Sequence, residues 1–221
     1  MSLVSYEQQG DVALITMDDG KANAMNETMI EAVHAALDQA QRDAKSVLIT
    51  GRPGLLSGGF DLAVIRSGDA EAAKSMVTAG GRLLMRLYGL PKPLVMVTSG
   101  HGVALGAFLL LTADYRFGAI GDFKIGLNEV AIGMTLPPFA LMLTNARIAP
   151  QHISNSAINA TMYTPEQAVG PGFLDEVVDS RQLMAQALEK AQALAALDGP
   201  AFVSTKQDLR GADIKRVMAT L

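Results

Sequence analysis

The sequence predicts a layered α/β domain, in which helices pack against a β-sheet. Short apolar, strand-like runs alternate with stretches that carry apolar residues at helical spacing. The length of 221 residues is typical of one domain. Hydrophobic residues make up 49% of the chain and charged residues 18%, so the chain can bury a large core and global disorder is excluded.

Hydrophobic periodicity and capping residues place the elements of the first half. Apolar residues on both sides of a turn at Gly10 and Asp11 predict a hairpin. Asn26 is a suitable N-cap for a helix. Asp61 comes directly after a glycine-rich loop and can cap the turn that follows it. The expected elements are a hairpin at residues 3–18, a helix from Asn26 to about Ala44, a buried strand at 46–50, a loop at 51–59 and a helix at 69–89.

Proline and glycine divide the second half of the chain. A buried strand follows Pro91-Lys92-Pro93, and Pro137-Pro138 opens a helix, since proline is tolerated in a first turn. A glycine turn at residues 100–102 leads into an apolar helix, and helices alone are expected after the last short strand. The expected elements are strands at residues 94–97, 114–119 and 123–125, and helices at 104–112, after Pro137, near 150–158, and at 165–169, 180–198 and 200–209.

Composition and charge exclude several classes of function. Lys and Arg total 18 against 22 Asp and Glu, so there is no basic excess for nucleic acid. The chain has no Cys, and its three His are far apart, so we expect neither disulfides nor a metal site. No apolar run approaches the ~18 residues of a membrane span, and no signal peptide is visible. We therefore expect a cytoplasmic protein that binds neither nucleic acid nor membrane.

Two segments share one construction, in which a buried strand leads through a glycine-rich turn into a helix. The first contains residues 58–62 and the second residues 100–106. Backbone N–H groups at a helix N-terminus are unpaired and carry partial positive charge, so two that converge would form an oxyanion hole. Spacing alone fits ordinary glycine-rich connections equally well. The second segment is only a weak match to a dinucleotide fingerprint.

Glu129 is a lone carboxylate within the apolar stretch 125–130. A carboxylate in apolar surroundings has a raised pKa and is suited to removing a proton. Taken alone, such a glutamate is more often a solvated loop residue. His101 is a second candidate base, although a histidine in a turn more often packs or forms hydrogen bonds within that turn.

Five segments, in order and correctly spaced, together resemble the crotonase (enoyl-CoA hydratase/isomerase) superfamily. The resemblance implies the crotonase-like (ClpP/crotonase) fold, a spiral of β-β-α units with a C-terminal helical extension. It also implies one domain over residues 1–221, with an α/β core to about residue 180 and a helical trimerisation region at about 181–221. The segments are residues 10–16 with 23–25, 56–62 (similar to the family's F-S-A-G-x-D-L motif), 100–106 with Asp114, 125–129 with 133–137, and 164–168 with 174–178.

The resemblance further implies an acyl-CoA thioester substrate and no separate cofactor, since coenzyme A is part of the substrate. The backbone N–H groups of Phe60 and Leu105 would hold the enolate oxygen that forms when an α-proton is lost, and Glu129 would be the base. A homotrimer or a dimer of trimers is expected. The expected substrate-binding residues are Ala22, Ala24, Gly59, Asp61, Leu62, Gly106, Phe108 and Met134.

The number of carboxylates separates the reactions of this family. Its hydratases use two glutamates, and these two positions fall on Phe108 and Glu129. One carboxylate can move a proton but activates a water poorly. We therefore predict a Δ3,Δ2-enoyl-CoA isomerase, in which Glu129 removes a C2 proton and returns it at C4. An enoyl-CoA hydratase and a noncatalytic acyl-CoA-binding paralogue remain open as alternatives.

Contacts with the coenzyme A phosphates are expected to differ from the usual ones. A lysine that often meets these phosphates in the family is replaced by Ala63, so Arg66 or Arg52 would have to substitute. The sequence ends at Leu221, earlier than in typical members. We therefore expect reduced cover over a neighbouring subunit's nucleotide.

Overall fold

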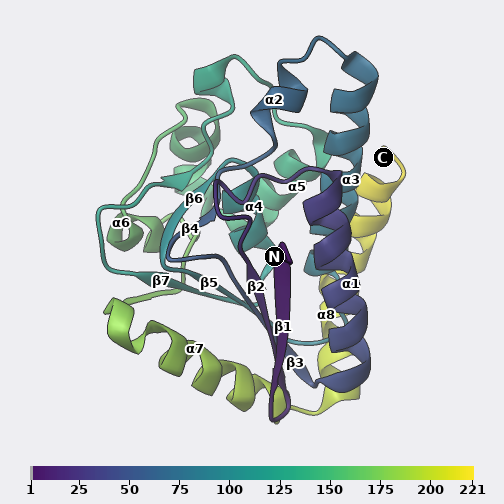
Figure 1. The fold of residues 1–221 in the computed structure, drawn as a ribbon, viewed down its shortest axis with the longest axis vertical. Coiled ribbons are helices and arrows are strands. Elements are labelled where there is room, and N and C mark those ends of the chain that lie inside the picture. Colours follow the sequence, from purple (N-terminus) through teal and green to yellow (C-terminus); the bar gives the residue numbers. More distant parts are fainter. Residues whose placement is uncertain (1) are drawn as a thin grey trace.

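The computed structural model describes residues 2–221, which form two β-sheets covered by helices (Figure 1). The strands in that part of the chain are β1 (Val4–Gln9), β2 (Val12–Met17), β3 (Ser46–Thr50), β4 (Gly54–Ser57), β5 (Leu94–Thr98), β6 (Gly100–Val103), β7 (Tyr115–Ala119), β8 (Ile125–Gly126) and β9 (Glu176–Val178). The α-helices are α1 (Glu27–Asp43), α2 (Leu62–Ile65), α3 (Ala70–Tyr88), α4 (Leu105–Thr112), α5 (Pro138–Arg147), α6 (Pro165–Val169), α7 (Ser180–Ala195) and α8 (Gly199–Met218). Short turns of 3-10 helix lie at Val130–Ile132 and Pro150–His152, and a π-helical turn lies at Ser154–Ile158.

Consecutive strands are divided between the two sheets. The larger sheet has the order β1-β2-β3-β5-β7-β9 and the smaller one β4-β6-β8. The strand pairs β3/β4, β5/β6 and β7/β8 each place their first strand in the larger sheet and their second in the smaller. Helices follow the second strand, so the chain repeats a β-β-α unit. Strands β1 and β2 are antiparallel, and the other neighbours are parallel. The predicted fold class is confirmed.

Three strands lie where the sequence predicts none. β4 is within the expected loop and β6 within the expected glycine turn. A Cβ on Gly100 would lie 1.8 Å from the carbonyl carbon of Gly54, so glycine is needed where these two strands approach. Glycine has a low strand propensity, which is why sequence pattern does not reveal these strands. The expectation of helices alone in the last third is wrong, because β9 pairs with β7 at the sheet edge.

Several boundaries also differ from expectation. The strand expected at residues 123–125 is β8, which begins at Ile125, and the helix expected at 200–209 continues to Met218. Near residues 150–158 the chain forms a 3-10 turn and a π-helical turn, where a regular helix is expected. None of the helices described in residues 2–221 has the length and apolar character to cross a membrane.

Alternate residues of the central strands face two separate cores. On one face, Val12 and Leu48 pack with Leu183 and Ala187 of α7. The residues of the opposite face belong to a larger core that includes α1, α3, α4 and α5. Figure 1 shows α7 on one side of the larger sheet, away from α1, α3 and α8. Helix α7 therefore covers one face of the larger sheet.

Candidate functional site

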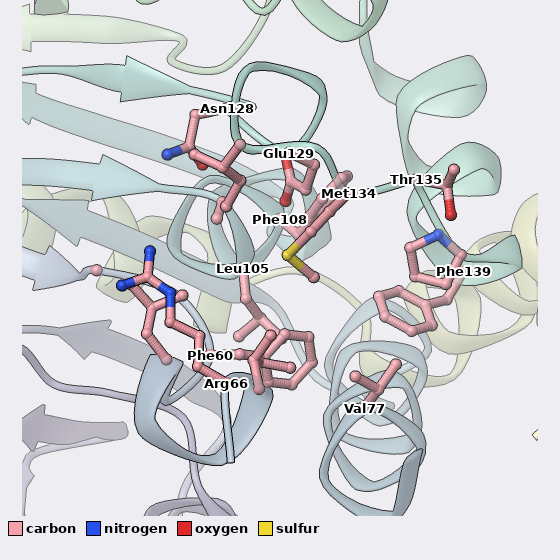
Figure 2. Close-up of a pocket in the computed structure, with 16 residues that line it drawn as sticks. Phe60, Arg66, Val77, Leu105, Phe108, Asn128, Glu129, Met134, Thr135 and Phe139 are labelled. Atoms are coloured by element: carbon pink, nitrogen blue, oxygen red, sulfur yellow. The ribbon is translucent and has the colours of Figure 1, made fainter. Parts of the chain in front are cut away.

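A cavity of about 320 Å³ lies between α3, α4 and the chain from residue 128 to residue 139 (Figure 2). Its wall is mainly apolar, which is typical of a pocket for an organic ligand. Residues from four distant parts of the sequence meet there. Six of the predicted site residues line it, and these are Phe60, Leu62, Leu105, Phe108, Glu129 and Met134.

The two glycine-rich segments meet at this cavity. β4 and β6 pair in parallel, which brings the turns that follow them together. A Cβ on Gly106 would lie 2.2 Å from the carbonyl oxygen of Ser57, so no side chain fits between the segments. Gly59 has a φ of +106°, and a Cβ there would lie 3.0 Å from the Cβ of Ala104. These close contacts explain why glycine stands at both positions.

Two backbone donors at the cavity wall have no acceptor in the described part of the chain, residues 2–221. Leu105 is the first residue of α4, and its N-cap residue Ala104, with a φ of +53°, makes no side-chain cap. Among residues 2–221, neither the N–H of Leu105 nor that of Phe60 donates a hydrogen bond. Both residues line the cavity. An oxygen atom bound there could accept from unpaired amides at low cost, since no internal bond has to break.

Asn23 holds the first glycine-rich segment in place. It lies in the motif segment 23–25, but it is not among the predicted site residues. It is fully buried with a φ of +46°, a conformation that asparagine tolerates better than most residues. Its Nδ2 donates to the carbonyl oxygens of Met17 (2.8 Å) and Leu56 (3.0 Å). Its own carbonyl oxygen accepts from Ser57 Oγ at 2.7 Å. Since these partners lie up to 34 residues away, the sequence gives no signal for this role.

The Glu129 carboxylate faces the cavity, opposite Phe60 and Leu105 (Figure 2). The residue is only 9% exposed, and its Oε2 has no hydrogen-bond partner in the part of the chain that the structure describes. Burial raises the pKa of Glu129 to about 7. Its backbone oxygen accepts from the N–H of Met134 at 2.9 Å, which fixes the tight turn after it. A carboxyl group with this pKa can both take and return a proton near neutral pH.

Glu129 and Arg66 are the only charged side chains among the residues that line the cavity within residues 2–221. Phe108, which is 2% exposed, lines the same space as Glu129. Of the two arginines expected to replace the missing lysine, the structure places Arg66 at the cavity. Arg52 instead donates from Nε to the carbonyl oxygen of Lys21 at 2.8 Å.

Five predicted site residues lie outside the cavity wall, and these are Ala22, Ala24, Gly59, Asp61 and Gly106. Asp61 caps α2, with its carboxylate accepting from the N–H of Ala63 at 2.9 Å. The carbonyl oxygen of Ala22 accepts from Gly58 N at 2.9 Å, so the loop that contains Ala22 and Ala24 runs beside the first glycine-rich segment. Their contact with a ligand stays a prediction.

His101 is not part of the cavity wall. Its Nδ1 accepts from the backbone N–H of Lys124 at 3.0 Å, and its ring packs edge-on against Phe123. This matches the packing role that the sequence reasoning preferred for it. No group of three or more His, Asp or Glu side chains in residues 2–221 is arranged to hold a metal ion.

Comparison with known proteins gives one consistent family. The enoyl-CoA hydratase/isomerase family model matches residues 7–216. A solved structure of an enoyl-CoA hydratase/isomerase family protein from Pseudomonas syringae is 44% identical with a TM-score of 0.95, over 98% of this chain and 94% of that one. The peroxisomal enoyl-CoA delta isomerase 2 of Arabidopsis thaliana is 27% identical over 94% of this chain and 92% of its own.

A relative named for the other reaction is equally similar. A probable enoyl-CoA hydratase of Bacillus subtilis is 28% identical over 89% of this chain and 76% of its own. Relatives at this distance therefore do not separate isomerase from hydratase. The resemblance seen in the sequence motifs is confirmed by a match that covers nearly the whole chain and by the shared fold, so this chain belongs to the enoyl-CoA hydratase/isomerase family.

Proposed function

We propose that the protein is a Δ3,Δ2-enoyl-CoA isomerase that uses Glu129 as its single acid–base group. The observation that carries this proposal is that Glu129 is the only carboxylate in the cavity wall within residues 2–221, and that Phe108 lines the same cavity. A double-bond shift needs one group that removes a proton and returns it elsewhere. Water addition also needs a second group that orients and activates the water.

In the proposed reaction, the thioester oxygen of a 3-enoyl-CoA accepts hydrogen bonds from the N–H groups of Phe60 and Leu105. Glu129 removes a proton from C2, and the electrons of that C–H bond form a C1–C2 double bond while the carbonyl electrons move onto the thioester oxygen. The C3–C4 double bond remains, so the product of this step is a dienolate. The two amides stabilise the negative charge that develops on the oxygen. Protonated Glu129 then delivers the proton to C4, which leaves the double bond between C2 and C3. Atoms and charge balance without any further reactant.

The apolar wall supports this chemistry in two ways. Burial raises the pKa of Glu129 to about 7, so the carboxyl group is a stronger base than an exposed glutamate and can still give up its proton. Phe108 and Met134 occupy the wall beside Glu129 and limit the room for water. Exclusion of water protects a dienolate and strengthens its electrostatic stabilisation.

The assembly of the protein is part of this proposal. We expect a homotrimer or a dimer of trimers. The cytoplasm stays the predicted compartment. The exposed side chains of Leu141 (48%) and Ile158 (64%) favour a surface that is covered by another copy of the chain. Analytical ultracentrifugation tests this part, because a species of about 23.3 kDa alone would contradict it.

The reaction is tested by giving the purified protein 3-hexenoyl-CoA and, separately, crotonyl-CoA. We expect the first to become the 2-enoyl isomer and the second to be hydrated little. Hydration of crotonyl-CoA as fast as isomerisation would instead identify a hydratase. Tight binding of both compounds without turnover would identify a noncatalytic acyl-CoA-binding protein.

A further inference from the structure

The cavity has two different ends. In Figure 2, the guanidinium group of Arg66 lies on one side of it, and Phe139 and Val77 lie on the other, with Glu129 between them. Arg66 is largely exposed, as a contact for the anionic phosphates of a coenzyme A would have to be. Phe139 is 1% exposed. A thioester whose reacting carbons lie under Glu129 would therefore extend its acyl chain toward Phe139.

Phe139 is held firmly in this position. It is the second residue of α5, directly after Pro137 and Pro138, whose fixed φ angles favour the first turn of the helix. Its ring packs against Gly81 of α3, where a Cβ would lie 2.6 Å from its Cδ1 atom. An alanine at residue 81 would thus collide with the ring.

The neighbouring glycine leaves room for a second aromatic wall residue, Phe60. A Cβ on Gly80 would lie 2.5 Å from Cε1 of Phe60. Glycine destabilises the interior of a helix, so two in succession in α3 need a packing reason. The reason here is the space that both rings occupy. The shape of the cavity at this end therefore depends on Gly80, Gly81 and the two rings seated on them.

We propose that Phe139, seated against Gly81, is the specificity-determining residue that stops the acyl chain, so that the site takes short- and medium-chain acyl-CoA thioesters and gains nothing from longer ones. This inference rests on the proposed acyl-CoA substrate and deepens it. The cavity volume of about 320 Å³ supports it, since that is near the lower end for ligand pockets.

The structure offers one competing path for a longer chain. Met134 and Thr135 line the cavity and also a second one of about 580 Å³ on the far side of the same loop. A long chain could enter the second cavity only by displacing these residues. If it did so, Phe139 would have no effect on chain length.

The test measures the binding of saturated acyl-CoAs by isothermal titration calorimetry, from butyryl- to hexadecanoyl-CoA. Saturated chains cannot isomerise, so the result is independent of turnover. We expect affinity to rise about fourfold for each added methylene, the factor that corresponds to ~0.8 kcal/mol, until the chain reaches Phe139. Beyond that length, at or before decanoyl-CoA, affinity should stop rising. A rise that continues to hexadecanoyl-CoA would overturn the proposal.

Variants assign the limit to Phe139. Phe139→Leu should move the break in affinity to longer chains, and Gly81→Ala should move it to shorter ones by pushing the ring into the cavity. Phe173→Leu is the matched control, because Phe173 is equally buried but is not a wall residue, and the break should stay in place. An unmoved break in folded Phe139→Leu would overturn the proposal. Failure to isomerise with an intact break would contradict only the proposed reaction.

Discussion

The two ends of α4 have opposite hydrogen-bonding environments. At its start, Ala104 provides no side-chain cap, and the N–H of Leu105 has no acceptor among residues 2–221. At its end, the Arg147 guanidinium donates to the carbonyl oxygens of Leu111 (3.2 Å) and Ala113 (2.9 Å). One helix thus has satisfied acceptors at one terminus and an unpaired donor at the other.

The carboxylates near these two ends differ in the same way. Asp114, just after α4, pairs with Lys206 at 2.7 Å and Arg210 at 2.9 Å, and all three side chains are largely buried. Within residues 2–221, Glu129, beside the start of α4, has no cation close enough to lower its pKa, and its Oε2 has no hydrogen-bond partner. The comparison teaches that polar groups are paired where they support the fold and unpaired where a ligand can complete them.

The largest expected effect comes from removing the charge of Glu129, the unpaired carboxylate beside the start of α4. Glu129→Gln should retain the fold and the affinity for acyl-CoA but lose roughly 10²–10⁴-fold in kcat, because an amide cannot take the C2 proton. Steady-state kinetics with 3-hexenoyl-CoA measures this loss. Glu189→Gln, an exposed change on α7, is the control and should be fully active. An active Glu129→Gln would remove this residue from the mechanism.

The corresponding change at Asp114, the paired carboxylate after the end of α4, should lower the stability of the fold. Asp114→Asn leaves Lys206 and Arg210 buried without their counter-charge, so the free energy of unfolding should fall by about 3–5 kcal/mol. Urea denaturation measures this fall. Asp213→Asn breaks an exposed pair with Arg216 and should cost less than about 1 kcal/mol. Equal losses in the two variants would mean that the cluster at Asp114 is not a special support.

The pH dependence of stability sharpens the comparison. The pKa of Glu129 is about 7 in the folded protein and near 4.5 when unfolded, so the unfolded chain loses this proton first as pH rises. The ionised group therefore destabilises the fold progressively between pH 4.5 and about 7, by up to about 3 kcal/mol above that range. Glu129→Gln should match the wild type near pH 4 and exceed it at pH 8. A difference that does not change with pH would show that Glu129 is not desolvated.

The smallest expected effect is a gain of function at the start of α4. Phe108→Glu places a carboxylate where hydratases of the family are expected to carry one, so hydration of crotonyl-CoA should rise. The gain should stay below about tenfold, because burial of a new carboxylate costs stability and raises its pKa. Phe108→Leu is the control, since it enlarges the space without adding a charge. A similar gain in both variants would attribute hydration to space for water alone.

Sequence patterns reveal those parts of this fold that owe their form to local chemistry. β3 and β5 are short apolar runs bounded by polar or proline residues, and Asn26 and Asp61 cap helices as expected. β4, β6 and β9 escape prediction because their strand form depends on pairing with distant partners. Glycine-rich or three-residue strands carry too little pattern of their own.

The candidate site divides along the same line. Glu129 can be predicted, because a carboxylate within an apolar stretch is unusual and stands at the family's motif position. Asn23 cannot, since its value lies in hydrogen bonds to Met17 and Leu56 that only the folded chain creates. The packing of Phe139 against Gly81 likewise cannot be predicted from the sequence, because the two residues are 58 positions apart and lie on different helices.

The cavity wall contains Phe60, Leu105, Glu129 and Phe139, which come from separate parts of the chain. A ligand bound there should therefore stabilise the folded state. No stretch of the unfolded chain can reproduce that arrangement, so an acyl-CoA should bind the native state alone. By mass action, ligand at about 100 times its Kd then adds about 2.7 kcal/mol to the apparent stability. The concentration of acyl-CoA around the protein would thereby govern how much of it stays folded and escapes proteolysis.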